Sequence, residues 1–330
     1  MNSFELIPTE ENLIHTLDKD LLKRNKDLVR FYDLILVQEG ASSIAIDGRW
    51  GSGKTFFVKQ SMLLINAKNP MSDMDDEKKA SIVYALPFPK KAEDMPENYD
   101  VAVYYDAWEN DNGTDPVLSL VYEIIKQLGI NYAFDDNSNA FKLAGSVLEA
   151  LTGRNINGII ENLKSDNPLT KIKEEKDLHE NIKNFFTELL VERGNRLVVF
   201  IDELDRCKPS YAVQLLERIK HYLYDDRITF VFSVNLGELQ HTIKHYYGNT
   251  FDACRYLDRF FDMRISLPPA DKTAFYREMG LESSYVLEKI CRKVIDTYNM
   301  ELREATRFYR QVKTAAYEPT HESRKFDFSF

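Results

Sequence analysis

Residues 48–55 read GRWGSGKT and match the pattern GxxxxGK[ST] at every specified position. Glycines allow a backbone to curl so tightly that its N–H groups point inward at phosphate oxygens. A lysine at this position reaches the β- and γ-phosphates of a nucleotide, and the next hydroxyl binds Mg²⁺. We therefore predict a phosphate-binding loop. The residues expected at the nucleotide are Gly48, Trp50, Gly51, Ser52, Gly53, Lys54, Thr55 and Phe56. Trp50 either packs under the loop or touches the nucleotide or a neighbour.

A second set of chemically active side chains follows an apolar run at residues 197–201. Asp202 and Glu203 come directly after this run. A phosphate-binding loop needs an acid at the tip of a neighbouring strand to hold Mg²⁺ through water. We predict that Asp202 and Thr55 hold the metal and that Glu203 orients or deprotonates the attacking water. The alternative is an acidic loop that caps the next helix, a role that also suits Asp205.

A third apolar run, Ile228–Val234, ends in a polar residue, Asn235. In ring-type ATPases a polar residue at this position senses the γ-phosphate or the attacking water, and Asn235 or Ser233 is a candidate for that role. The alternative is that Asn235 only begins a turn before Gly237.

The elements that must position these residues alternate along the chain. A buried strand at 42–47 precedes the loop and a helix at 54–66 follows it, which is the context the pattern requires. Strands alternating with helices imply a parallel sheet covered by helices on both faces. We expect a three-layer α/β core over residues 1–270, with a polar helical insert at about 131–195 and a C-terminal helical lid at 271–330. Further expected segments are a helix at 11–37, a loop at 67–80, a strand at 101–108, helices at 210–223 and 236–247, and a strand at 263–267.

Composition excludes several classes of protein. The chain has 330 residues, and 43 Lys and Arg against 53 Asp and Glu give a net charge of −10, which argues against a nucleic-acid-coating protein. The three cysteines are widely spaced and form no CxxC pair, so neither a disulfide framework nor a cysteine-built zinc site is expected. No apolar run approaches the length of a membrane helix. These features predict a cytoplasmic protein without a transmembrane segment.

Four motifs in order carry a resemblance to a known family. They are Gly48–Thr55, Asp106–Trp108, Asp202–Cys207, and Tyr256–Arg259 with Leu267 and Pro268. On these residues the chain resembles the KAP family of P-loop NTPases, which belongs to the ASCE division near the AAA+ and STAND ATPases. The resemblance covers about residues 15–315. The chain departs from the family pattern in three respects: its insert is polar and lacks membrane helices, Asn235 replaces an acid, and Arg259 replaces a lysine.

The resemblance implies ATP and Mg²⁺ as ligands and further site residues. Arg303 on the lid is the candidate to reach back to the nucleotide, and Arg307 shares its helix face; the alternative is surface pairing with acids of the same helix. Arg259, with Arg255, is the candidate finger that enters a neighbour's site, unless both are simply solvated. Residues 21–25 resemble the adenine-side motif of STAND and AAA+ proteins.

The function expected from these residues is a Mg²⁺-dependent, ATP-hydrolysing molecular switch. The resemblance implies a homo-oligomer, a protein effector, and a setting in bacterial anti-phage defence or signalling. The competing reading is an ATP-binding scaffold with little turnover, against which Glu203 argues, because a pure binder needs no residue to orient water. A motor on nucleic acid is disfavoured by the net charge of −10. The sequence leaves the choice between ATP and GTP open.

Overall fold

In the part of the chain that the structure describes, a five-stranded, fully parallel sheet forms the centre of the fold, with strand order β2-β3-β4-β1-β5. The computed structural model describes residues 7–88, 99–112, 115–128, 184, 186–187, 190, 194–222, 225–281 and 285–316. The strands are β1 (Ser42–Asp47), β2 (Asp100–Asp106), β3 (Arg196–Asp202), β4 (Ile228–Val234) and β5 (Met263–Ser266). The expected helical insert at 131–195 lies almost entirely outside the described residues.

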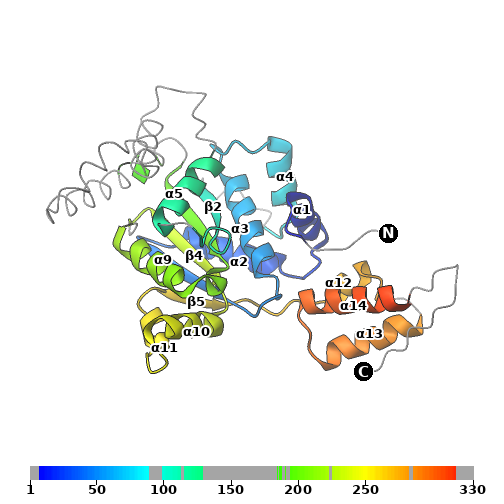
Figure 1. Cartoon of the computed structure of the whole chain (residues 1–330). Helices are drawn as coiled ribbons and strands as arrows, with labels where there is room; N and C mark the ends of the chain where they lie inside the picture. Colours follow the sequence, from blue (N-terminus) through cyan, green and yellow to red (C-terminus); the bar gives the residue numbers. More distant parts are fainter. Residues whose placement is uncertain are drawn as a thin grey trace, which may run out of the picture.

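Two helical layers cover the sheet, as the alternation of elements predicts (Figure 1). Side chains of β3 alternate between them: Val199 and Ile201 join one apolar cluster, and Val198 and Phe200 join the other. Such a strand is buried on both faces, which explains its continuous apolar sequence. One layer contains α1 (Glu10–Lys19), α2 (Asn25–Leu36), α3 (Lys54–Lys68) and α4 (Asp76–Tyr84). The other contains α5 (Pro116–Gln127), α9 (Pro209–Tyr222), α10 (Leu236–Tyr247) and α11 (Ala253–Leu257).

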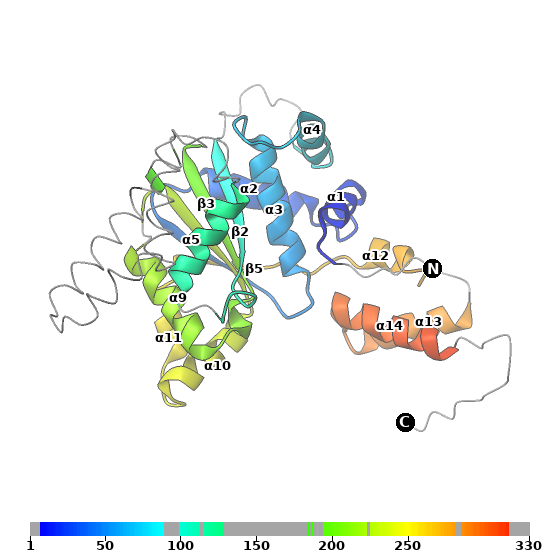
Figure 2. The same cartoon turned by 45° about the horizontal axis from the view of Figure 1, so that its top comes forward.

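The C-terminal lid forms a third apolar cluster of its own. It consists of α12 (Thr273–Glu278), α13 (Val286–Thr297) and α14 (Leu302–Ala316), built around Phe275, Ile295 and Tyr309. Figures 1 and 2 show these helices as a group set beside the sheet and joined to it by the segment after β5. All three helices lie within the segment 271–330 that was expected to be helical.

Two local predictions were wrong. The expected helix at 11–37 is two helices, because Asp20 and Lys23 adopt φ of 45° and 55° and end α1 before α2 begins. The expected loop at 67–80 contains the start of α4, whose first turn is capped by the Asp75 carboxylate accepting a hydrogen bond from Lys78 N–H.

Strand order determines how the predicted site residues meet. β1, which precedes the phosphate loop, and β3, which ends in Asp202, do not pair with each other, because β4 lies between them. Asp202 is therefore not on a strand that neighbours β1. Asn235 follows β4, which is the strand between β1 and β3. Within the described part of the chain, no helix is long and apolar enough to cross a membrane.

Candidate functional site

The phosphate loop leaves β1 and enters α3 through two left-handed glycines. Gly51 and Gly53 have φ of 81° and 91°, values that side chains other than glycine rarely adopt. Gly53 is the residue before α3, so the first N–H groups of this helix face the loop. A helix N-terminus with free N–H groups is an intrinsic anion site, as the motif predicts.

Lys54 is folded back onto its own loop. Its Nζ donates hydrogen bonds to Gly48 O at 2.5 Å and Arg49 O at 3.2 Å, and the residue is 8% exposed. Burial lowers the pKa of Lys54, whereas Asp205, Asp202 and the neighbouring acids oppose this effect. An incoming phosphate would replace the two carbonyl oxygens as a stronger, charged acceptor.

Asp202 and Glu203 form a tight turn at the end of β3. Asp202 is 1% exposed, and its carboxylate accepts hydrogen bonds from Tyr104 OH at 3.1 Å and from Glu203 N–H at 2.9 Å. Glu203 has φ 60° and ψ 22°, the left-handed region that is uncommon for a residue with a side chain. Such conformations are costly and cluster at functional sites.

The Glu203 carboxyl group has an unusual proton affinity. Burial, with the negative charges of Asp202 and Asp205, raises the pKa of Glu203 to about 7, although Arg206 and Arg303 oppose this shift. A carboxylate with this pKa suits a general base near neutral pH. Its Oε2 lies 2.6 Å from Arg206 Nε.

Trp50 joins the phosphate loop to the acidic turn, the segment Asp202–Arg206 at the end of β3. Its Nε1–H donates a 2.6 Å hydrogen bond to Asp205 Oδ2. Burial raises the pKa of the Asp205 carboxyl group, and the bond from Trp50 opposes this shift. Asp205 therefore accepts a hydrogen bond from the phosphate loop, and Trp50, which is 44% exposed, contributes this polar contact rather than packing under the loop.

A cavity of about 570 Å³ opens between the sheet edge and the lid. Lys54, Thr55 and Glu203 line it together, and α14 supplies Arg303 and Arg307. Neither arginine forms an ion pair with Glu301 or Glu304 in the described residues. The lining of this cavity also includes further predicted nucleotide contacts, namely Trp50, Gly51, Gly53 and Phe56, and the adenine-side candidates Leu21 and Leu22.

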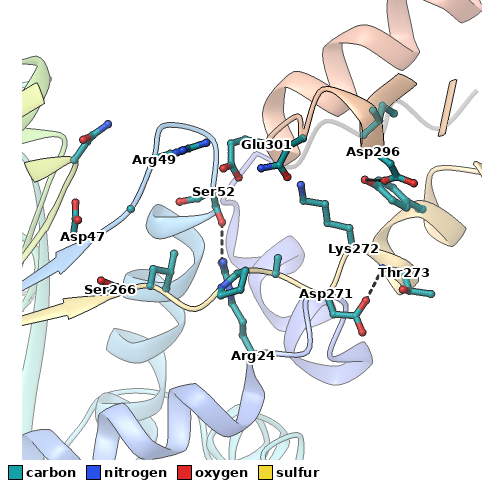
Figure 3. A pocket seen from close by; sticks show the side chains of 18 of the residues that line it. Arg24, Asp47, Arg49, Ser52, Ser266, Asp271, Lys272, Thr273, Asp296 and Glu301 are labelled. Carbon is teal, nitrogen blue, oxygen red and sulfur yellow. Dashed lines mark hydrogen bonds between the residues drawn. The ribbon is translucent and has the colours of Figure 1, made fainter. Parts of the chain in front are cut away.

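A second cavity of about 660 Å³ lies on the other side of the loop (Figure 3). Gly48, Ser52 and Asn235 line it rather than the first cavity. Figure 3 shows Arg24 under the loop, where its Nη1–H donates to Ser52 O at 2.8 Å. Its Nη2–H donates to Pro268 O at 2.5 Å, so Arg24 connects the loop to the segment that leads into the lid.

Asn235 also has a structural role. Its side chain accepts a 3.4 Å hydrogen bond from Glu238 N–H and caps α10. Asn235 thus begins α10, as one of the two predictions has it, and it also lines the second cavity together with Asp47 and Gly48. Ser233 is fully buried, and its Oγ has no hydrogen-bond partner among the described residues.

Arg259 is not brought to this site within one chain. It lines a small cavity with Ser42, Ser43 and Ile228, at the first residues of β1 and β4. The phosphate loop follows the last residue of β1. Arg259 therefore lies at the amino ends of the parallel strands, and Lys54 lies at their carboxyl ends. Arg255 and Arg259 are both exposed.

The residues present fit a Mg²⁺–nucleotide. Ser52 Oγ, which belongs to the phosphate loop itself, is buried without a hydrogen-bond partner in the described part, and a bound phosphate would supply one. In the residues that the structure describes, no cluster of three His, Cys, Asp or Glu can hold a metal alone. Mg²⁺ is usually held by one or two protein ligands together with substrate phosphates, and Thr55 with Asp202 would be those ligands.

Sequence reasoning gave no role to Arg206 or to the contacts of Arg24. Arg206 was visible in the motif Asp202–Cys207, but only the fold brings its guanidinium 5.5 Å from the Trp50 ring centre and 5.8 Å from that of Trp108. Arg24 belongs to the segment resembling an adenine-side motif, and nothing in that segment points to the distant Pro268.

Comparisons with known proteins agree with this geometry. The sequence model of the KAP family P-loop domain matches residues 25–318. A curated relative, the uncharacterized protein MJ0182 of Methanocaldococcus jannaschii, is 33% identical over 95 residues, which cover 26% of this chain and 49% of that protein. The chain thus matches about half the length of that relative. Because the family match includes the phosphate loop, the acidic turn and the described lid helices, this chain belongs to the KAP family of P-loop NTPases.

Proposed function

We propose that the chain binds Mg²⁺–ATP between the sheet edge and the lid and hydrolyses it as a molecular switch. The observation that carries this proposal is one cavity lined by Lys54, Thr55, Glu203 and the lid residue Arg303. Mg²⁺–ATP would supply the phosphoryl group that water attacks. Lys54 would bind its terminal phosphates, Thr55 and Asp202 would hold the metal, and Glu203 would accept the proton of the water.

The lid is the part that would report the nucleotide state. A Cβ atom on Gly51 would lie 3.1 Å from Cβ of Arg303 and 3.4 Å from Cβ of Glu301, so the lid already contacts the phosphate loop. A phosphate in the loop would change this contact and draw Arg303 toward negative charge. Differential contact of this kind is what couples a ligand to a conformational change.

The direct test is ATP binding and phosphate release by the wild type and two variants. Lys54→Ala should lose Mg²⁺–ATP binding, whereas Glu203→Gln should bind ATP but hydrolyse it at least about 100-fold more slowly. Arg30→Ala, an exposed change on α2, serves as the control that should alter neither property. Unchanged ATP affinity in Lys54→Ala would overturn the proposed site.

A second candidate is an ATP-binding scaffold with little turnover. The contact that favours it is the 2.6 Å ion pair between Arg206 and Glu203, because a carboxylate held by arginine is not free to accept a proton. In the same assay a scaffold would bind ATP, while wild type and Glu203→Gln would release phosphate at the same low rate.

We also propose self-association and a protein effector. Arg259 lies at the amino ends of the strands, and its own phosphate loop lies at their carboxyl ends. This position supports a role in a neighbour's site rather than its own. A setting in anti-phage defence or signalling stays a prediction from the family resemblance.

A further inference from the structure

The ion pair between Arg206 and Glu203 is built into one short turn. The 3₁₀ turn Leu204–Arg206 places the two side chains three residues apart, with Arg206 Nε 2.6 Å from Glu203 Oε2. Their side chains are only 22% and 15% exposed. Partial burial makes this pair stronger than one on an open surface, where solvent and salt screen the charges.

Two tryptophans from distant segments flank the guanidinium of Arg206. Trp50 comes from the phosphate loop and Trp108 follows β2, and their ring centres lie 5.5 Å and 5.8 Å from the guanidinium carbon. Arginine is attracted to aromatic faces at such distances. Trp50 is also bonded to Asp205, so Arg206 and the residue before it both contact the phosphate loop through Trp50.

We propose that Arg206 exchanges partners, pairing with Glu203 when no nucleotide is bound and with the terminal phosphate when ATP is bound. Glu203 would then be released to accept a proton only while ATP occupies the site. This inference rests on the proposed ATP site and assigns the control of its base to Arg206.

The shared cavity makes this exchange possible. Arg206, Glu203, Lys54 and Thr55 all line the same 570 Å³ space. A terminal phosphate offers three oxygens and more negative charge than one carboxylate, and the planar guanidinium suits a two-point contact with it. ADP lacks the terminal phosphate, so with ADP bound Arg206 would stay on Glu203.

The chain carries its own reporter for this exchange. Its two tryptophans, Trp50 and Trp108, both lie beside Arg206, so intrinsic emission senses the movement of that guanidinium. The experiment titrates wild type, Arg206→Gln, Arg206→Lys and the control Arg30→Gln with Mg²⁺–ADP and with an imido-bridged, non-hydrolysable ATP analogue. Calorimetry measures each affinity, fluorescence measures the emission, and circular dichroism checks folding.

In wild type and the Arg30→Gln control, the analogue should change the tryptophan emission in a way that ADP does not. Arg206→Gln should bind ADP within about twofold of wild type but the analogue about 10-fold or more weakly, the scale of a charged hydrogen bond, and should lose the emission difference. Arg206→Lys keeps the charge without the fork and should recover part of the affinity.

Two results would overturn the exchange while leaving the ATP site intact. One is an Arg206→Gln variant that binds the analogue as tightly as wild type. The other is a wild type in which ADP and the analogue give the same emission, a measurement that does not depend on any variant folding. Failure of wild type to bind either nucleotide would instead refute the proposed function itself.

Discussion

The Trp50 indole donates a 2.6 Å hydrogen bond to the Asp205 carboxylate across 155 positions of sequence. This bond connects the phosphate loop to the turn that directly follows the proposed base Glu203. It also satisfies one oxygen of a carboxylate that is only 5% exposed.

Replacing Trp50 by phenylalanine should therefore destabilise the fold. The ring remains, but Asp205 Oδ2 loses its donor, and an unsatisfied buried acceptor costs about 1–3 kcal/mol. The free energy of unfolding in urea measures the loss. Trp108→Phe is the matched control, because Trp108 is 53% exposed and forms no side-chain hydrogen bond in the described part. Equal stability of the two variants would contradict the role given to the Trp50 bond.

Arg24→Leu should lower both stability and nucleotide affinity. Arg24 is 5% exposed and binds two carbonyl oxygens, Ser52 O and Pro268 O, which would lose their donors. We expect a loss of about 1–3 kcal/mol in unfolding free energy and weaker ATP binding, since the loop is no longer held. Denaturation and calorimetry test this, with the exposed Arg30→Leu as control. Wild-type ATP affinity in Arg24→Leu would show that the loop holds its shape unaided.

Turnover should depend on pH through Glu203. Burial raises the pKa of this carboxyl group to about 7, and only its deprotonated form accepts a proton from water. The value of kcat/KM should therefore fall about tenfold per pH unit below that pKa and level off above it. The residual rate of Glu203→Gln should lack this dependence. A wild-type profile that is flat between pH 5.5 and 8 would exclude Glu203 as the base.

Shared sites between subunits should allow two inactive variants to rescue each other. The changes Lys54→Ala and Arg259→Ala lie at opposite ends of the parallel strands, so a mixed assembly can contain one site with both residues intact. Mixing them should restore part of the turnover, and wild-type specific activity should fall on dilution. Specific activity that stays constant on dilution, without rescue, would mean that the monomer acts alone.

The sequence alone determined the fold class and the main chemical groups. The phosphate loop is contiguous, and its function depends on local backbone conformation and on the two elements beside it, so GRWGSGKT between a strand and a helix was sufficient. Asp202 and Glu203 were also recognisable, because they directly follow a continuous apolar strand. Two local errors, the break after Asp20 and the start of α4, arose where capping and backbone turns override apolar spacing.

Only the tertiary structure decided which of these groups meet. Strand order places β4 between the loop and the acid, and no periodicity encodes the order of strands in a sheet. The bonds of Arg24 to Pro268 and of Trp50 to Asp205 span 244 and 155 positions. Such contacts depend on how separate segments pack, so composition and spacing within each segment could not reveal them. Likewise, only the folded chain brings the guanidinium of Arg206 beside Trp50 and Trp108, the contacts that point to its role in controlling Glu203.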